Sequence, residues 1–566
     1  MKALTKQPAR KLPESATRRV ALIAILLLVV LIVRLFYYTG PVFANTQDEI
    51  IYYSQIVNTA VFHSGYNFSS YRNVDFSNLT NVNFNPDKAF QFYVGLMYPE
   101  IMLAHAFGYS VNLPIYYVML TSVIEALFIF LIVERISSIR AAAISCILFA
   151  FLPLNVLFST QLEPQVPLAM ASSVAVYFFI VALDAKTLRK ISSVSLVSGL
   201  FIGFGFVTNP FGSATLVFIA LFLAILSAKI LISRSGGKED LRKNIIIFAL
   251  IIGGFAAAYS VPGLLYQAES GNFFLYPEVY HSITLYQFET QASPYLNITR
   301  NLSIVEITGS PYFYLPILMD QPSYYYDPYL RYWGISFYVL VGMLLFLPKS
   351  KHSWAYFFGL MFIVYLAIMS LAPTAIITRN SATYVLLDSK LPYVAEALTL
   401  PSVVMVALGM DALIRSRKKL FVTVAILILL AVVCTDLIDL QHDSQYYRAS
   451  IATVKDLAAF AASHPNSTIY AQWIFAEEAN LYSGYKYHIN STSCASEGSL
   501  ELNNSYIALG GTTNFDMSPP IMYNFTTCTL ANFSEYSRAY NVTDPYARFG
   551  NDSVPQFEII NLSNRK

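Results

Sequence analysis

The sequence predicts an α-helical polytopic membrane protein with about eleven transmembrane helices and a small C-terminal α/β domain. Of its 566 residues, 56% are hydrophobic and only 12% are charged, whereas a soluble protein carries about 25% charged residues. Mean hydropathy is +0.51. Apolar segments of spanning length recur through residues 20–440, and basic residues mark alternate connections between them. These three observations place the chain among multi-span membrane proteins.

The first apolar run, VALIAILLLVVLIVRLFYY, follows a basic segment at residues 1–19. A cleaved signal peptide, with VFA at 42–44 as its cleavage site, is the alternative. The run is longer than the apolar core of a signal peptide, and many spans follow, so we expect a retained helix. Ten further spans are predicted at 113–134, 139–158, 167–183, 193–209, 212–232, 244–266, 330–348, 353–373, 391–413 and 419–439.

Basic residues predict the orientation of these spans. With the N-terminus in the cytoplasm, every second connection should be basic. The connections that meet this rule are ERISSIR (134–140), DAKTLRK (184–190), SRSGGKEDLRK (233–243), PKSKH (348–352) and IRSRKK (414–419). We therefore expect a cytoplasmic segment at 1–19, a transmembrane domain at 20–440 and an outer soluble domain at 441–566. The predicted outer loops are 39–112, 159–166, 267–329 and 374–390.

Glycosylation sequons give a second, independent signal for the orientation. The twelve N-x-S/T sequons begin at Asn67, Asn78, Asn297, Asn301, Asn466, Asn490, Asn503, Asn524, Asn532, Asn541, Asn551 and Asn561. All of them fall in segments that the charge rule places outside. Single sequons arise by chance, but their one-sided distribution indicates an outer face open to glycosylation. It favours a glycoprotein of the plasma membrane.

The apolar stretch at 93–111, YVGLMYPEIMLAHAFGYSV, is not counted as a span. Counting it would invert every later connection and place the basic ones outside. It also contains Pro99, Glu100 and His105. We expect an interfacial helix on the outer surface instead.

Residues 441–566 are expected to form the α/β domain. The predicted strands are STIYAQWIF, NSYIALGG and PQFEIINL, and the predicted helices are VKDLAAFAASH and FAEEANLYS. Cys494 and Cys528 both lie in this domain, where an oxidising exterior favours a disulfide between them. Two free thiols are the alternative. Cys146 and Cys434 lie in predicted spans and are expected to be packing residues.

Three carboxylates near the outer membrane boundary are the candidate catalytic residues. Asp48 and Glu49 follow the first span, and Glu163 lies at the tip of the short second outer loop. Charge at such a boundary is costly unless it is used or paired. Burial there raises the basicity of a carboxylate, which suits a general base. For Glu163 the alternative is a favourable contact with the N-terminal dipole of the following helix.

A phosphate-bearing lipid substrate would need a cation on the same side. Arg379 and Arg331 are the candidates, with Lys390 and His281 behind them. Arginine suits this role because its planar fork binds phosphate through two hydrogen bonds. The alternative for both arginines is a snorkelling anchor at the interface.

At these residues the chain resembles a known family. A first span followed by an outer loop that opens with an acidic pair, here TQDE, is the hallmark of GT-C glycosyltransferases, which take sugar from polyprenyl-phosphate donors. The chain is most similar to the branch of protein mannosyltransferases and aminoarabinose transferases. The resemblance covers roughly residues 20–440 and includes, in order, LMYPEIMLAHAFGYS, FLPLNVLFSTQLEPQVPLAMASSVAVYFF, GLFIGFGFVTNPFG and VPGLLYQAESGNFF.

The resemblance implies a role for each matching residue. Asp48 would be the base that activates an acceptor hydroxyl, with Glu49 beside it. Glu163 would be the second-loop acid, which shapes the site or joins Asp48 in binding a divalent metal where the enzyme uses one. Arg379 or Arg331 would hold the donor phosphate. The chain departs from the family where the interfacial helix often has a Pro-Pro pair, since Glu100 follows Pro99 here.

The sequence thus predicts a membrane glycosyltransferase that moves a sugar, such as the hexose mannose, from a polyprenyl- or dolichyl-phosphate donor. The acceptor is a protein, a lipid or a glycan, and the reaction is an inverting transfer in which positioning and charge stabilisation do most of the catalysis. Oligosaccharyltransferases fit less well, because their tail motif begins with paired tryptophans and Trp333, Trp354 and Trp473 are unpaired.

Two other classes of function remain as alternatives. A transporter is expected to show repeated halves and ionisable residues at span centres, which appear nearly free of charge here. A catalytically inactive scaffold is the second alternative. Membrane lipids are expected partners. With a net charge of +2, no basic patch and no zinc-type spacing, the chain gives no indication of nucleic-acid binding.

Overall fold

The computed structural model describes most of the chain apart from the long predicted outer loops. The described residues are 16–38, 94–209, 212–233, 238–270, 286–288, 300–302, 353–371, 374–378, 381–385, 398–415, 419–483, 489–492, 504–510, 545–551 and 554–562, with single positions at 40, 52, 53, 56, 57, 60, 273 and 486. The chain divides into two compact units, which are described separately. Unit 1 comprises residues 1–37, 89–98 and 117–441, and unit 2 comprises residues 38–88, 99–116 and 442–566.

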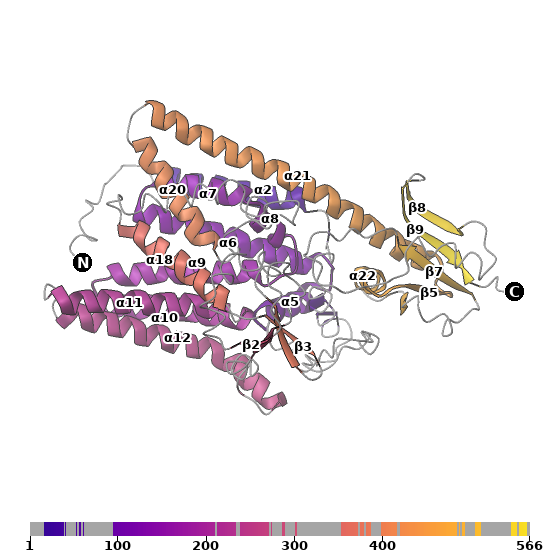
Figure 1. The fold of residues 1–566 in the computed structure, drawn as a ribbon, viewed down its shortest axis with the longest axis horizontal. Helices are drawn as coiled ribbons and strands as arrows, with labels where there is room; N and C mark the ends of the chain where they lie inside the picture. Colours follow the sequence, from indigo (N-terminus) through magenta and orange to yellow (C-terminus); the bar gives the residue numbers. More distant parts are fainter. Residues whose placement is uncertain are drawn as a thin grey trace. The chain divides into compact units, whose positions relative to one another are not determined.

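Long apolar helices make up most of unit 1 (Figure 1). They are α2 (Ala16–Tyr37), α6 (Leu113–Ile136), α7 (Ile139–Phe151), α8 (Pro153–Ser159), α9 (Gln165–Asp184), α10 (Leu188–Thr208), α11 (Ser213–Ser233), α12 (Lys238–Ser270), α18 (Ser353–Leu371), α20 (Thr399–Arg415) and α21 (Lys419–Ser463). Among the described residues, 7 helices are long and apolar enough to cross a membrane, or 8 if the bent pair α7–α8 is one span. The prediction of a multi-span helical protein is confirmed, and the predicted span at 330–348 lies outside the described residues.

A small sheet in unit 1 was not predicted. Its order is β2-β1-β4-β3, with β1 (Tyr286–Phe288), β2 (Arg300–Leu302), β3 (Thr374–Thr378) and β4 (Ser381–Val385). β3 and β4 form an antiparallel hairpin. The strands come from two predicted outer loops, and the β-branched residues of TAIIT and SATYV are the signal that could have revealed the hairpin.

Glycines allow α10 to pack closely against α12. A Cβ at Gly199 would overlap the carbonyl oxygen of Ile251, and one at Gly203 would lie 2.6 Å from the Cβ of Ala258. On the facing helix, a Cβ at Gly254 would overlap the carbonyl oxygen of Leu196. Small residues at such crossings let two backbones approach in a membrane, where apolar lipid gives helices little hydrophobic reason to associate.

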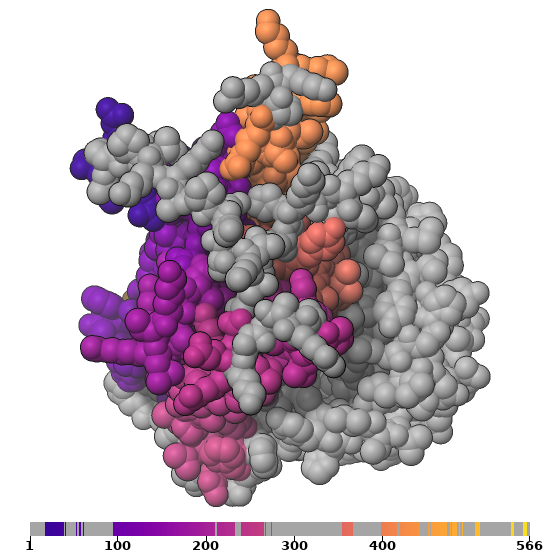
Figure 2. Space-filling view, turned by 90° about the vertical axis from the view of Figure 1, so that its left-hand side faces the viewer, coloured from indigo at the N-terminus to yellow at the C-terminus, as the bar shows by residue number. Residues whose placement is uncertain are grey.

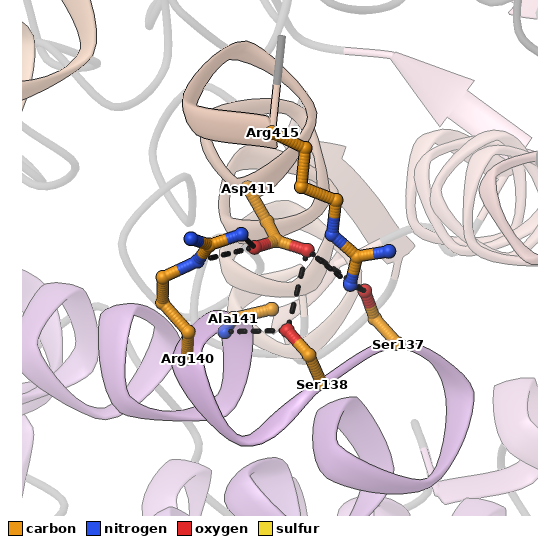
Figure 3. Close-up of polar contacts among 6 residues, drawn as sticks. All are labelled: Ser137, Ser138, Arg140, Ala141, Asp411 and Arg415. Carbon is orange, nitrogen blue, oxygen red and sulfur yellow. Dashed lines mark hydrogen bonds and ion pairs between the residues drawn. The ribbon is translucent and has the colours of Figure 1, made fainter. Parts of the chain in front are cut away.

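One end of unit 1 carries a charged cluster around Asp411 of α20 (Figure 3). Its carboxylate is 2% exposed and lies 2.8 Å from Nη2 of Arg140 on α7 and 2.6 Å from Nη2 of Arg415. The hydroxyls of Ser137 and Ser138 each donate to the same carboxylate over 3.2 Å. Two of the predicted basic connections, 134–140 and 414–419, therefore meet at one buried acid.

Figure 2 looks onto this end of unit 1, where the indigo start of α2 and the orange helices α20 and α21 come to the surface. A third ion pair, 2.6 Å long, joins Arg19 of α2 to Glu134 of α6. A fourth, 2.9 Å long, joins Arg135 of α6 to Asp184 of α9. Three of the predicted basic connections, 134–140, 184–190 and 414–419, thus take part in ion pairs within unit 1.

Unit 2 contains a five-stranded mixed sheet. Its strands are β5 (Thr468–Gln472), β6 (Ile489–Thr492), β7 (Ser505–Gly510), β8 (Ala547–Asn551) and β9 (Val554–Asn561), in the order β6-β5-β7-β9-β8. β6, β5 and β7 are parallel, whereas β9 pairs antiparallel with β7 and β8. The sheet includes the three predicted strands, and the predicted α/β character of this region is confirmed.

The helices of unit 2 differ in part from the prediction. α22 (Trp473–Ser483) covers the helix expected at FAEEANLYS. The helix expected at VKDLAAFAASH is not separate but is the last part of α21, a single helix of 45 residues. This part packs Leu457 and Phe460 into a core with Ile469 of β5 and Ile559 of β9.

Segments of the predicted first outer loop also belong to unit 2. α5 (Val94–Phe107) confirms a helix within the stretch 93–111; it belongs to unit 2 from Pro99 onward, and its 14 residues are fewer than a span requires. Beyond it, the Tyr109 hydroxyl donates to the carbonyl of Leu481 on α22 over 3.2 Å. The Tyr53 hydroxyl donates to the carbonyl of Val111 over 2.8 Å. The predicted first outer loop is therefore hydrogen-bonded to α22 within unit 2.

We expect neighbouring glycines of α12 to respond oppositely to alanine. In Gly254→Ala the new methyl meets the backbone of α10, so the free energy of unfolding should fall by about 1–3 kcal/mol. In Gly253→Ala nothing lies within 4 Å of the new Cβ, and the gain in helix propensity should raise stability by up to about 1 kcal/mol. Heat unfolding of the detergent-solubilised chain tests both. Equal effects of the two substitutions would contradict the close packing.

Glu478 on α22 should make the stability of the chain depend on pH. Its side chain is 4% exposed, and burial raises its pKa from 4.5 to about 8. Between these values the unfolded chain releases the proton that the folded chain retains. The free energy of unfolding should therefore fall as pH rises from 4.5 to about 8, by at most about 1.4 kcal/mol per pH unit.

The measurement is heat unfolding of the full chain at pH 5 and pH 8. Glu478→Gln should flatten the difference, because glutamine does not titrate. Glu239→Gln, which changes an exposed carboxylate of α12, is the matched control and should leave it unchanged. An equal pH dependence in wild type and Glu478→Gln would show that Glu478 is not the titrating group.

Candidate functional site

Glu163 is the one candidate catalytic or phosphate-binding residue that lies within the described part of the chain. Asp48, Glu49, Arg331 and Arg379 lie outside it, and so do Lys390 and His281. The proposed disulfide partners Cys494 and Cys528 also lie outside it. Of the described cysteines, Cys146 is buried as expected, whereas Cys434 is exposed.

The loop that carries Glu163 is short and enclosed. It follows α8, a helix whose seven residues are all buried, and it ends at Pro164, the N-cap of α9. The amide of Gln161 donates to the carbonyl of Phe158 over 3.4 Å, which continues the turn beyond α8. Glu163 is 1% exposed. The sequence reasoning thus placed it correctly in a tight connection between two helices.

The structure leaves the dipole alternative for Glu163 open. The side chain of Pro164 makes no cap hydrogen bond, and Glu163 directly precedes it. A negative carboxylate at this place is stabilised by the positive N-terminal end of the dipole of α9. That effect is compatible with a second role in a reaction site.

The predicted third span is broken just before this loop. α7 ends at Phe151, α8 begins at Pro153, and the two helices are bent by 61° relative to each other. Pro153 has no N–H to donate to Phe149, four residues earlier, so the carbonyl of Phe149 has no helical partner. In a bilayer such a carbonyl must find another donor, because no water reaches it.

Arg34 of α2 supplies the donors at this break. Its side chain is 0% exposed. Nη2 donates to the carbonyl of Phe149 over 3.2 Å, and Nη1 donates to the carbonyl of Ala150 over 2.5 Å. The guanidinium also lies over the ring of Phe149, 5.1 Å from its centroid. Arg34 therefore joins the first span to the break in the third.

Asn155 of α8 extends this network to α6. Its Oδ1 accepts from Nη2 of Arg34 over 2.6 Å and from the Ser122 hydroxyl over 2.7 Å. Its Nδ2 donates to Oε2 of Glu125 over 3.4 Å. Glu125 is 0% exposed and lies near the middle of α6. The expectation that span centres are nearly free of charge is therefore wrong for α6, although the charge belongs to a structural network.

The Gly-rich stretch GLFIGFGFVTNPFG forms the end of α10 and the turn after it. The backbone of Thr208 lies so close to α5 that a Cβ at Gly95 would be 2.8 Å from its amide nitrogen. Beyond Thr208, the amide of Gly212 donates to the carbonyl of Asn209 over 2.8 Å. This turn therefore contacts the start of α5 within unit 1.

Glu100 is a buried acid that the sequence reasoning treated only as a departure from the family pattern. It follows Pro99 inside α5 and is 1% exposed. Neither carboxylate oxygen has a hydrogen-bond partner among the described residues. Burial raises the pKa of this carboxyl well above its usual range.

No group of three His, Cys, Asp or Glu side chains that could hold a metal ion occurs among the described residues. The predicted pair for a divalent metal is Asp48 with Glu163. Since Asp48 lies outside the described ranges, the structure tests neither this pair nor the need for a metal.

The sequence reasoning missed the Arg34 network. The signal was a single charged residue, Arg34, inside the run VVLIVRLFYY, together with Asn155 and Pro153 in FLPLNVLF. A charge inside an apolar span is costly and therefore usually has partners in the bundle. Its partners could not be named from the sequence, because they lie on three other helices.

A family model matches part of this chain. The family model described as dolichyl-phosphate-mannose-protein mannosyltransferase matches residues 102–258. This region includes Glu163, the α7–α8 break and the Gly-rich end of α10. No curated protein sequence matches the chain.

Two solved structures share the fold. ArnT from Cupriavidus metallidurans bound to undecaprenyl phosphate aligns with a TM-score of 0.58 at 14% identity, over 98% of this chain and 100% of that one. The archaeal oligosaccharyltransferase AglB from Archaeoglobus fulgidus, in complex with an inhibitory peptide and a dolichol-phosphate, aligns with a TM-score of 0.52 at 13% identity, over 82% of this chain and 64% of that one. The predicted resemblance to the GT-C superfamily is confirmed, and this chain has the GT-C fold.

Proposed function

We propose that this chain is a membrane glycosyltransferase that uses a polyprenyl-phosphate sugar donor. The observation that carries the proposal is the fold match to ArnT over 98% of the chain. The match of the mannosyltransferase family model to residues 102–258 supports it independently. A buried glutamate at the second-loop position of this fold supports the presence of a reaction site.

In the proposed mechanism, Asp48 is the general base. It takes the proton of an acceptor hydroxyl while the acceptor oxygen attacks the anomeric carbon, and the bond to the lipid phosphate breaks with inversion. The leaving phosphate monoester needs little protonation. Glu49 lies beside the base in the sequence, and Glu163 shapes the site or shares a divalent metal with Asp48.

Arg379 or Arg331 holds the phosphate of the donor in this proposal, since a guanidinium forms two parallel hydrogen bonds to it. The transferred sugar is proposed to be a hexose such as mannose, in line with the family description. The acceptor is a protein, a lipid or a glycan.

The chain is proposed to lie in the plasma membrane, with its N-terminus in the cytoplasm and residues 441–566 outside. The one-sided sequons and the basic connections support this orientation. Its transmembrane domain is proposed to extend over 20–440. A bilayer of membrane lipids is then the surrounding medium for the site.

Transfer in isolated membranes tests the catalytic roles. With a radiolabelled polyprenyl-phosphate hexose as donor, Asp48→Asn should lower the rate about 100-fold or more, because general bases contribute about 10²–10⁴. Glu163→Gln should lower the rate by a smaller factor. Glu239→Gln, at an exposed position of α12, is the matched control and should transfer normally at equal expression.

Either of two results would contradict this proposal. Normal transfer by Asp48→Asn would exclude Asp48 as the base. No transfer by wild type, with several polyprenyl-phosphate sugars and with protein, lipid and glycan acceptors, would favour the scaffold or transporter alternative.

Glycosylation mapping tests the orientation. Asn466 is exposed in the turn between α21 and β5 and starts the sequon Asn466-Ser467-Thr468. In a host whose oligosaccharyltransferase acts only in the lumen, we expect a glycan on Asn466 that Asn466→Gln removes. Ala3→Asn creates a sequon in the predicted cytoplasmic segment and should stay unmodified. Mass spectrometry reads both sites, and modification at residue 3 but not at 466 would invert the orientation.

A further inference from the structure

We propose that Arg34 is a positioning residue for the transfer reaction, because it holds the α7–α8 bend and thereby fixes the loop that carries Glu163. This inference rests on the proposed function for its catalytic part. Its structural part, the link between Arg34 and the position of the loop, stands independently and has a test of its own.

All five guanidinium donors of Arg34 have acceptors in unit 1. An arginine side chain offers one donor at Nε and two at each terminal nitrogen. Nε donates to the Ser122 hydroxyl over 3.2 Å, and Nη1 donates to the carbonyls of Val30 and Ala150. Nη2 donates to the carbonyl of Phe149 and to Oδ1 of Asn155. Arg34 therefore retains no donor for the phosphate of a substrate, and its role is to hold protein groups.

The acceptors of Arg34 lie on both sides of the α7–α8 bend. The carbonyls of Phe149 and Ala150 are the last turn of α7, and Asn155 lies in the first turn of α8. Pro153 between them removes the backbone N–H that would have continued the helix. One planar guanidinium thus contacts both sides of the break. Lysine could not replace it, because its ammonium lacks the fixed fork of donors.

Apolar packing next to Arg34 strengthens the same connection. Val33 of α2 shares a buried cluster with Val156 of α8 and Leu440 of α21. In the sequence, Val33 directly precedes Arg34, and Val156 directly follows Asn155. The first span therefore contacts α8 through both a polar and an apolar pair.

The path from the bend to Glu163 is short and closely packed. α8 has seven residues, all buried, and the Thr160 hydroxyl and amide both bond back to the carbonyl of Leu157. Leu162 is 0% exposed and Glu163 is 1% exposed. Since packed interiors transmit small displacements, a change in the bend angle moves the loop.

The first experiment measures loop position without using activity. Leu162→Cys places a thiol next to Glu163, and its modification by a membrane-permeant maleimide is followed by mass spectrometry of the peptide. We expect slow labelling when Arg34 is present and at least tenfold faster labelling with Arg34→Lys. If that variant does not fold, Ser122→Ala is used instead. It removes the acceptor of Nε and should also raise the labelling rate at residue 162.

Arg140→Lys is the matched control for this labelling. Arg140 also binds through its guanidinium, but its side chain is 47% exposed and its partner is Asp411. Its replacement should leave the labelling rate at residue 162 unchanged. Pro153→Ala restores the missing N–H at the bend. The labelling rate of the double variant Pro153→Ala with Arg34→Lys should therefore not exceed that of the faster single variant. Unchanged labelling in Arg34→Lys would overturn the proposal.

The second experiment tests the catalytic part by a double-mutant cycle. Arg34→Lys should lower kcat by at least tenfold in the wild-type background, with KM for the donor changed less than threefold. In the Glu163→Gln background the further loss should be less than threefold, because the residue that Arg34 positions is already impaired. Equal losses in both backgrounds would show a general destabilisation and overturn the positioning role.

The two experiments separate the failure of this inference from that of the proposed function. If wild type transfers no sugar under any donor, the proposed function fails while the labelling still decides whether Arg34 holds the loop. If wild type is active and the labelling or the cycle gives the contrary result, the inference fails and the glycosyltransferase proposal stands.

Discussion

The contact between the guanidinium of Arg34 and the carbonyls of Phe149 and Ala150 is the constraint on which the bend before the Glu163 loop depends. A proline break inside a span exposes backbone carbonyls, and the bilayer provides no water to satisfy them. Arg34 satisfies them from another helix, and the same side chain contacts Asn155 beyond the break. The bend is thereby a fixed feature of the helix bundle, and the enclosed connection with Glu163 follows from it.

Closely packed helices surround this bend in unit 1. α9, α10 and α12 pack as neighbouring helices in unit 1, and glycines at the α10–α12 crossing bring the backbones into contact. The same Gly-rich helix ends at Thr208, beside the start of α5. Because apolar side chains gain little by leaving lipid, shape and backbone approach determine how these helices associate. The region matched by the family model contains both the α10–α12 crossing and the bend.

Hydropathy and charge were sufficient to predict the helical membrane class, because a span must be apolar over its whole length and connections must be polar. They failed where the outcome depends on tertiary contacts. The sequence reasoning placed Glu163 in a tight loop but did not find its connection to Arg34, which depends on residues about 115 positions away. It also separated α21 into two helices, since hydropathy changes after residue 439 although helix formation does not. Asp48, Glu49 and both phosphate-binding candidates remain predictions.

The clusters around Asp411 and Arg34 in unit 1 both depend on guanidinium hydrogen bonds, but the exposure of the guanidinium groups differs. At Asp411 the carboxylate is buried and the guanidinium groups of Arg140 and Arg415 are 47% and 42% exposed. Water therefore screens the arginine side of each pair, although the carboxylate itself is enclosed. At Arg34 the guanidinium itself is enclosed and its acceptors are mostly neutral. Removing it would leave several buried acceptors without donors, and each of them would then carry its full desolvation cost. The position of the Glu163 loop therefore depends on the cluster that has no access to water, and this is the physical reason for assigning the positioning role to Arg34.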